Sequence, residues 1–161
     1  MRALLFGAIA GLAATTAMTG VMRRMHPHLP AGERYPLPPR QITERVARMA
    51  GIHASENALE TAAVVAHFLY GGLTGAAYPL ITRSRSPVVG AGYGIATWAA
   101  SYLGWLPLAG ILKPATEHPV RRNLLMLTAH ALWGAALASG LREMERARTY
   151  GFMGGLNRDA T

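Results

Sequence analysis

Four long stretches without a charged side chain constrain this sequence more than any other feature. They cover residues 3–22, 61–82, 86–112 and 123–141 and hold 20, 22, 27 and 19 residues. A helix rises about 1.5 Å per residue, so each stretch is long enough to cross a hydrocarbon core of about 30 Å. The sequence therefore predicts an all-α membrane protein with four transmembrane helices.

The charged residues are few, and they gather between these stretches. They make up 15% of the 161 residues, against about 25% in soluble domains. The net charge of +8 comes from Arg and Lys in the connections, which is how membrane proteins contact lipid headgroups. The stretches leave no element for reading nucleic acid, so we expect a lipid bilayer and no nucleic acid as partner. The chain has no Cys, which excludes disulfides and thiolate metal sites.

The first stretch has two interpretations, a secretory signal or a permanent anchor. It follows Arg2 as a signal would, but it is full length, lacks a polar cleavage region and ends at Arg23 and Arg24. We interpret it as an uncleaved anchor. We expect residues 1–141 to form the transmembrane domain and residues 142–161 to form a polar, Arg-rich tail that begins as a helix.

Two other segments carry local signals. After Pro39, the apolar residues Ile42, Val46 and Met49 recur at helical spacing, which predicts a short amphipathic helix, lying on the membrane surface or solvated as part of a loop. In the third stretch, Trp105 and Pro107 indicate an interfacial anchor and a kink or early stop.

The second and fourth stretches share a motif. Residues 67–72 read HFLYGG and residues 130–135 read HALWGA, a common His-x-Leu-aromatic-Gly-small pattern. The first and third stretches match more weakly, through Gly-Ala-x-x-Gly at positions 7–11 and 90–94. The chain is therefore predicted to be two duplicated hairpins related as parallel repeats.

Small residues at helical spacing are expected to face other helices, because they let two backbones approach closely in lipid. The glycines concerned are Gly7, Gly11, Gly71, Gly75, Gly90, Gly94 and Gly134.

His67 and His130 are the strongest candidates for a functional site. Both lie about two helical turns, or roughly 10 Å, inside the membrane from the same side, and ionisable side chains in a membrane normally face an interior or a cavity. We expect them to face each other. We expect no cofactor and hydrogen-bonded packing as their role, with two alternatives: binding of haem or another tetrapyrrole, and a proton or small-solute path. The side chains predicted to line such a path on the same faces are Tyr70, Thr74, Tyr78 and Trp133.

The sequence offers little for other chemistry. No nucleophile, base and acid pattern is present, so we expect no catalytic site, and the four stretches contain no Asp or Glu, which argues against an ion-coupled transporter. His26, His28, His53 and His118 fall in loops without a known ligand spacing, so we expect no metal site.

Three segments resemble the YagU-like bacterial inner-membrane proteins, a family of unknown function. They are the GAIAG opening at residues 7–11, the LPPR turn at residues 37–40 and the HFLYG helix at residues 67–71. The resemblance covers residues 3–140 and implies a bacterial inner-membrane location. It implies no catalytic residue, cofactor or substrate.

The expected function is therefore that of a non-enzymatic structural or interaction subunit, associating with itself or with a larger membrane complex through its Gly and Ala stripes. The alternatives are a small-solute or proton channel and a haem-binding membrane protein. Four spans place both termini on one side. The Arg and Lys residues are divided almost evenly between the two sides, and the short segments on the N-terminal side favour the cytoplasm there.

Overall fold

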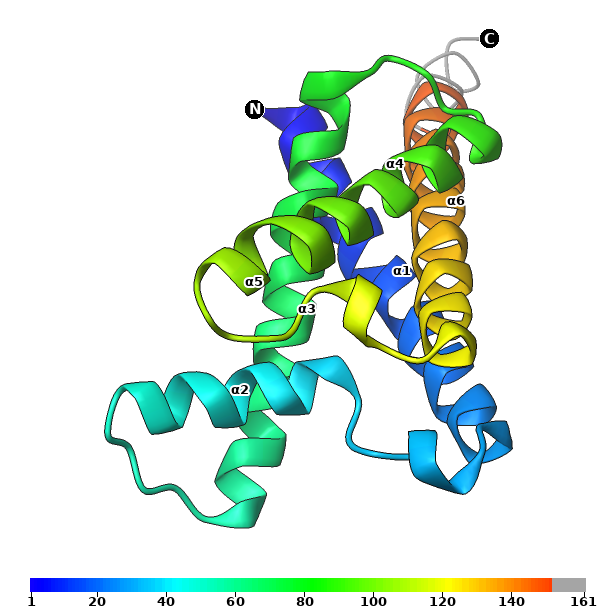
Figure 1. Cartoon of the computed structure of the whole chain (residues 1–161). Coiled ribbons are helices and arrows are strands. Elements are labelled where there is room, and N and C mark those ends of the chain that lie inside the picture. Colours follow the sequence, from blue (N-terminus) through cyan, green and yellow to red (C-terminus); the bar gives the residue numbers. More distant parts are fainter. Residues whose placement is uncertain (152–161) are drawn as a thin grey trace, which may run out of the picture.

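The computed structural model describes residues 1–151, and every regular element within them is a helix. The long helices are α1 (Arg2–Met25), α3 (Glu56–Ile81) and α6 (Val120–Gly151). The shorter ones are α2 (Pro38–Met49), α4 (Pro87–Ala99) and α5 (Leu106–Leu108), with η3 (Ala100–Trp105) between α4 and α5. Single turns occur at η1 (His26–His28), η2 (Ala31–Glu33) and η4 (Ala115–Glu117). The predicted all-α class is confirmed (Figure 1).

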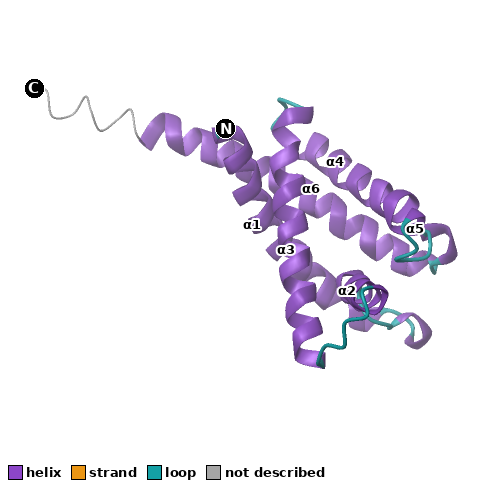
Figure 2. Cartoon of the chain, turned by 90° about the vertical axis from the view of Figure 1, so that its left-hand side faces the viewer, coloured by secondary structure: helices purple, strands orange, loops and turns teal. Residues whose placement is uncertain are grey.

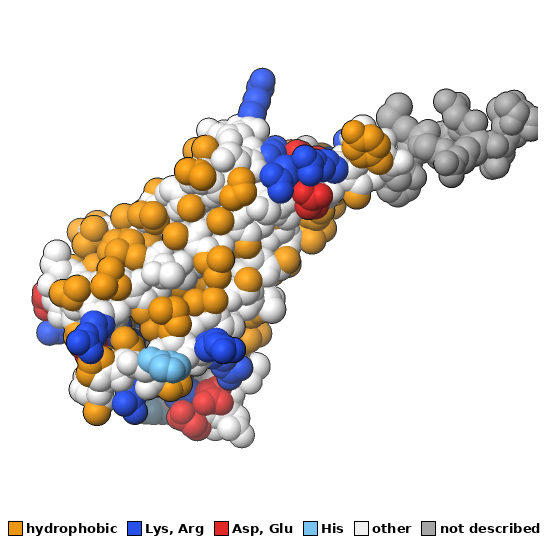
Figure 3. Space-filling model, turned by 90° about the vertical axis from the view of Figure 1, so that its right-hand side faces the viewer, with side chains coloured by type: hydrophobic (Ala, Val, Ile, Leu, Met, Phe, Trp, Pro, Cys, Tyr) orange, Lys and Arg blue, Asp and Glu red, His pale blue; other side chains and the backbone are white. Residues whose placement is uncertain are grey.

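Within residues 1–151, three helices are long and apolar enough to cross a membrane. They correspond to α1, α3 and α6, with mean hydropathies of 1.7, 1.3 and 1.5 over their most apolar windows. Charged side chains gather at the two ends of the molecule, and mainly hydrophobic and uncharged side chains lie between them (Figure 3). These features are those of a membrane protein.

The third charge-free stretch forms an irregular helical segment that is kinked and shorter than predicted. It runs through α4, η3 and α5 and ends at Leu108, whereas the stretch itself extends to residue 112. Pro107 has no N–H and its ring excludes the carbonyl four residues earlier, so the helix widens before it. In this wider π turn the Leu106 N–H bonds to the Ser101 carbonyl, five residues back, and the Gly104 backbone leaves helical geometry (φ −112°, ψ −108°).

The helices pack as two pairs. α1 lies against α3, α4 lies against α6, and α1 joins the pairs by packing on α6, whereas α3 and α4 make little main-chain contact. Figure 2 shows α4 alongside α6 and α2 beside one half of α3. The opening between α3 and α4 is therefore bridged by side chains instead of by close helix packing.

Glycines form the seam within each pair. A Cβ atom on Gly75 of α3 would lie 2.5 Å from the Gly7 carbonyl oxygen and 2.7 Å from Gly11 Cα. On α6, a Cβ on Gly134 would lie 2.8 Å from the Gly94 nitrogen and would also meet the Gly90 carbonyl. Both pairs thus place one glycine between two glycines of the partner helix, an approach that any side chain would prevent.

The α2 helix closes one end of the bundle. Pro38 and Pro39 occupy its first turn, where the missing N–H groups cost nothing, and the chain leaves the helix through Gly51 with φ +67°. The Arg40 guanidinium joins α2 to α3 through an ion pair of 2.6 Å with Glu56, and it also pairs at 2.6 Å with Glu44 within α2. The amphipathic helix thus forms where the sequence predicts it.

Candidate functional site

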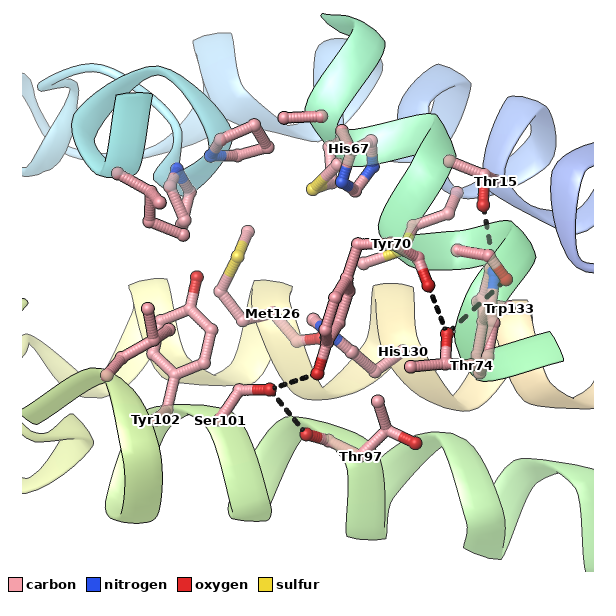
Figure 4. Close-up of a pocket in the computed structure, with 18 of the residues that line it drawn as sticks. Thr15, His67, Tyr70, Thr74, Thr97, Ser101, Tyr102, Met126, His130 and Trp133 are labelled. Carbon is pink, nitrogen blue, oxygen red and sulfur yellow. Dashed lines mark hydrogen bonds between the residues drawn. The ribbon is translucent and has the colours of Figure 1, made fainter. Parts of the chain in front are cut away.

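A cavity of about 230 Å³ lies inside the bundle, between α1, α2, α3, η3 and α6. Most of the side chains that line it are apolar. They include three buried methionines, Met18 and Met22 of α1 and Met126 of α6. Polar groups interrupt this lining, and most of them come from α3, η3 and α6 (Figure 4). This combination of apolar walls and few polar groups is typical of small-molecule sites.

Both predicted histidines line this cavity. His67 extends from α3 and His130 from α6, on different sides of the open space in Figure 4. The His130 Nδ1 lies 2.8 Å from the Met126 carbonyl oxygen, which fixes the ring's orientation. The His67 Nε2 atom is buried and has no hydrogen-bond partner among the described residues. A buried nitrogen without a partner costs about 1–3 kcal/mol, so a bound group that pairs with it is favoured.

A short hydrogen-bond chain crosses from α3 to the α4–η3 helix. The Ser101 hydroxyl donates to the Thr97 carbonyl at 2.9 Å, so its oxygen is free to accept. The Tyr70 hydroxyl, 2.9 Å away, therefore donates to Ser101. This chain, drawn in Figure 4, spans the opening that main-chain packing leaves between α3 and α4.

The widened turn of η3 brings several side chains to the cavity. A π turn holds more residues than an α turn, so residues one, four and five positions apart share a face. Ser101, Tyr102, Trp105 and Leu106 have this spacing, and all four line the cavity. Such turns are frequent at functional sites.

The cavity has a mouth between α3 and η3. Three of its lining residues are exposed there, Ala66 and Tyr70 on α3 and Trp105 on η3. The Tyr70 and Trp105 rings lie 6.2 Å apart between centroids. The surface next to the mouth carries exposed Leu69, with 59% of its side chain accessible, and Leu103, with 51%.

The opposite side of the cavity is closed by the start of α2, through Pro38, Pro39 and Ile42. The segment leading into α2 is fastened by Arg122, which is 3% exposed. Its guanidinium donates to the carbonyls of Glu33, Tyr35 and Pro36 at 3.1, 3.0 and 2.5 Å. It also stacks 3.6 Å from the centre of the Tyr35 ring. These contacts compensate for burying the charge.

Some of the other predicted site residues line the cavity and others do not. Thr74, Trp133 and Gly71 line it. The Trp133 indole donates to the Thr15 hydroxyl at 3.1 Å, which joins α6 to α1. Tyr78 is buried but does not line the cavity, because its hydroxyl donates to the Ser84 carbonyl at 3.0 Å.

The remaining predicted glycines, Gly7, Gly11, Gly75, Gly90, Gly94 and Gly134, lie in the two seams and not in the cavity.

The sequence reasoning missed Ser101, Tyr102 and the three methionines. For Ser101 and Tyr102 the available signal was Gly104 and Pro107, because a proline within a helix changes the side of the helix on which the preceding residues lie. The methionines carry no such signal, since a buried Met is normally a core residue.

Binding of a tetrapyrrole between His67 and His130 stays a prediction. Within residues 1–151, no cluster of three or more His, Asp or Glu side chains is placed to hold a metal ion.

Comparison of the chain with protein-family profiles, curated protein sequences and solved structures finds no match. The resemblance to the YagU-like family therefore stays a prediction.

Proposed function

We propose that this protein binds a small, largely apolar molecule inside the membrane, in the cavity between α3, η3 and α6. The observation that carries the proposal is the pairing of an apolar cavity with a buried polar atom of its lining, His67 Nε2, that has no partner among the described residues. This proposal differs from the small-solute or proton channel that the sequence left open as an alternative, because it assigns binding and no transport.

The size of the cavity supports a ligand with one ring. An apolar cavity of about 150 Å³ accommodates benzene, and the volume here is about 230 Å³. A six-membered ring with a few substituents therefore fits.

The packing of the glycines favours binding over a purely structural role. The stripes at Gly7, Gly11 and Gly75, and at Gly94 and Gly134, are occupied by contacts within one chain. These stripes are therefore not available to a second copy, and they were the main sequence argument for a subunit of a larger complex. Association through other surfaces remains compatible with ligand binding.

The proposal includes a finer architecture, with α4, η3 and α5 together acting as a fourth span. These elements form 22 consecutive residues, Pro87 to Leu108, long enough at about 1.5 Å per residue. The similar seams at Gly75 and Gly134 support two parallel hairpin repeats. We further propose a bacterial inner-membrane location with both termini cytoplasmic, on the basis of the family resemblance and the short Arg-containing segments.

The test uses the detergent-purified protein and 4-fluorotoluene, whose fluorine NMR signal reports bound ligand. Saturable binding is expected, on top of the non-saturable partition into micelles. An Ala66→Phe variant should abolish it by filling the mouth. Val65→Phe is the matched control, because Val65 is 51% exposed on the same helix and does not line the cavity. No saturable binding, or equal binding by both variants, would refute the proposed function.

A further inference from the structure

We infer that the occupant of this cavity is a lipid-soluble alcohol or phenol, with its hydroxyl at His130 and an alkyl tail leaving through the mouth. This inference rests on the proposed binding function and names the chemical class of the ligand.

The tautomer of His130 identifies the group that it can bind. A carbonyl oxygen only accepts, so the His130 Nδ1, 2.8 Å from the Met126 carbonyl, must donate. In an apolar cavity the imidazole is neutral, because a charge there is costly. The other nitrogen, Nε2, is then a pure acceptor, and no donor reaches it within the described part of the chain. A ligand that pairs with it must bring a donor.

Tyr102 supplies the complementary group. Its ring lies 6.4 Å from the His130 ring between centroids, nearly perpendicular to it. The side chain is only 7% exposed, and its hydroxyl forms no hydrogen bond with residues 1–151. Figure 4 shows this hydroxyl pointing into the open space between the helices. It can donate to a ligand oxygen.

A hydroxyl group satisfies both residues at once. It donates its proton to His130 Nε2 and accepts from Tyr102 through its oxygen. A ketone, quinone or ether of the same shape only accepts, so it would leave the His130 nitrogen unpaired. An acceptor that a bound ligand covers without pairing costs about 1–3 kcal/mol, which corresponds to an affinity loss of about 5- to 150-fold.

The mouth explains how such a ligand arrives. It is flanked by the exposed apolar side chains Leu69 and Leu103 and framed by Tyr70 and Trp105. A tail in this opening would lie among lipid chains while the ring and hydroxyl stay inside. The ligand therefore comes from the bilayer and not from water.

The decisive comparison uses two probes of matched shape, 4-nonylphenol and 4-nonylanisole, with the unchanged protein in detergent. Affinities are expressed per mole fraction in the micelle, so that partition does not contribute. The phenol is expected to bind at least about tenfold more tightly. Equal affinities would overturn the hydroxyl assignment, and this comparison needs no variant that could fail to fold.

Two variants then locate the hydroxyl. His130→Leu and Tyr102→Phe should each reduce the preference for the phenol, whereas Thr128→Val, an exposed change on the same helix as His130, should keep it. A preference that survives in both cavity variants would refute the placement at His130 and Tyr102.

The tail is tested with unsubstituted phenol and anisole. If the two small probes differ but the two nonyl probes bind no better than they partition, the ligand has no tail in the mouth. If 4-fluorotoluene binds saturably and no phenol is preferred, the binding function stands and only this inference falls.

Discussion

The indole nitrogen of Trp133 lies 3.1 Å from the hydroxyl oxygen of Thr15, on a helix 118 residues earlier in the chain. The Thr15 hydroxyl in turn donates to the Gly11 carbonyl at 2.8 Å. This buried contact connects the α1–α3 pair to the α4–α6 pair at the level of the cavity. It is therefore expected to contribute to the stability of the whole bundle.

A double-mutant cycle measures that contribution. Trp133→Phe and Thr15→Val should each destabilise the protein, and the pair should show a coupling energy of about 0.6–1 kcal/mol, typical of hydrogen bonds between transmembrane helices. The measurement is the free energy of unfolding in mixed micelles. Additive effects would mean that the two side chains do not stabilise the bundle through each other.

The seam between α4 and α6 can be probed at neighbouring glycines. Gly94→Ala should destabilise, because its Cβ would lie 2.8 Å from the His130 carbonyl carbon. Gly92→Ala is the matched control, since nothing lies within 4 Å of a Cβ at that position, and alanine there favours the helix by about 1 kcal/mol. Thermal unfolding in detergent should separate the two by several degrees. Equal melting temperatures would argue against a close seam.

Arg122 is expected to be hard to replace. Arg122→Lys keeps the charge but cannot reach three carbonyls with a planar fork, so the segment at residues 26–37 should loosen. Limited proteolysis of that segment should become at least several-fold faster. Arg121→Lys, an exposed neighbour, serves as control, and equal cleavage of the two variants would refute the role given to Arg122.

The His118 side chain predicts a pH dependence outside the membrane. Its Nε2 donates to the Lys113 carbonyl at 3.2 Å and its Nδ1 accepts from the Tyr35 hydroxyl at 3.0 Å. Partial burial, helped by Arg122 and Lys113 and opposed by that carbonyl and Glu117, lowers the pKa of His118 below 6.5. The unfolded chain then takes up a proton more readily than the folded chain.

The stability that neutral His118 contributes is therefore complete above about pH 6.5 and is lost as the pH falls through the lowered pKa. The difference in unfolding free energy between the native protein and His118→Gln should shrink from pH 7.5 to pH 5. Taking this difference removes the contribution of the other histidines to the unfolding free energy, because they are the same in both proteins. A difference that stays constant over this range would contradict the assignment.

The number of membrane spans determines whether the two termini lie on the same side of the membrane. With α4, η3 and α5 as a fourth span, reporter fusions after Met1 and after Thr161 should give the same location. Three spans would put the termini on opposite sides, and that result would also remove the fourth span from the proposed architecture.

The helices were predictable because charge excludes a residue from a hydrocarbon core. The stretches at residues 3–22 and 123–141 each lie within one long helix, and the stretch at residues 61–82 lies within another except for its last residue. The early end of the third stretch follows from Pro107, whose sequence signal was interpreted as a kink or stop. Residues 152–161 of the expected tail lie outside the described residues.

The details of packing were less predictable. The shared motif aligns Gly71 with Gly134. In the seams, however, the α3 glycine that takes the position equivalent to Gly134 is Gly75, one helical turn after Gly71. A helix of small residues fits its partner at successive turns almost equally well, so sequence spacing does not select the register. Arg122 looked like the boundary of a span, and nothing local indicated three carbonyls from a segment 86 or more residues earlier.

The long separation between Arg122 and its carbonyl partners also orders the assembly of the protein. The segment before α2 is synthesised first. Its carbonyls at Glu33, Tyr35 and Pro36 have no guanidinium to pair with until Arg122, at least 86 residues later in the chain, has been synthesised. During that interval α1, α2 and α3 can form, but the segment that leads into α2 lacks the side chain that holds it in place. Only the synthesis of α6 supplies Arg122, so a nascent chain that ends before Arg122 cannot hold the start of α2 against the cavity.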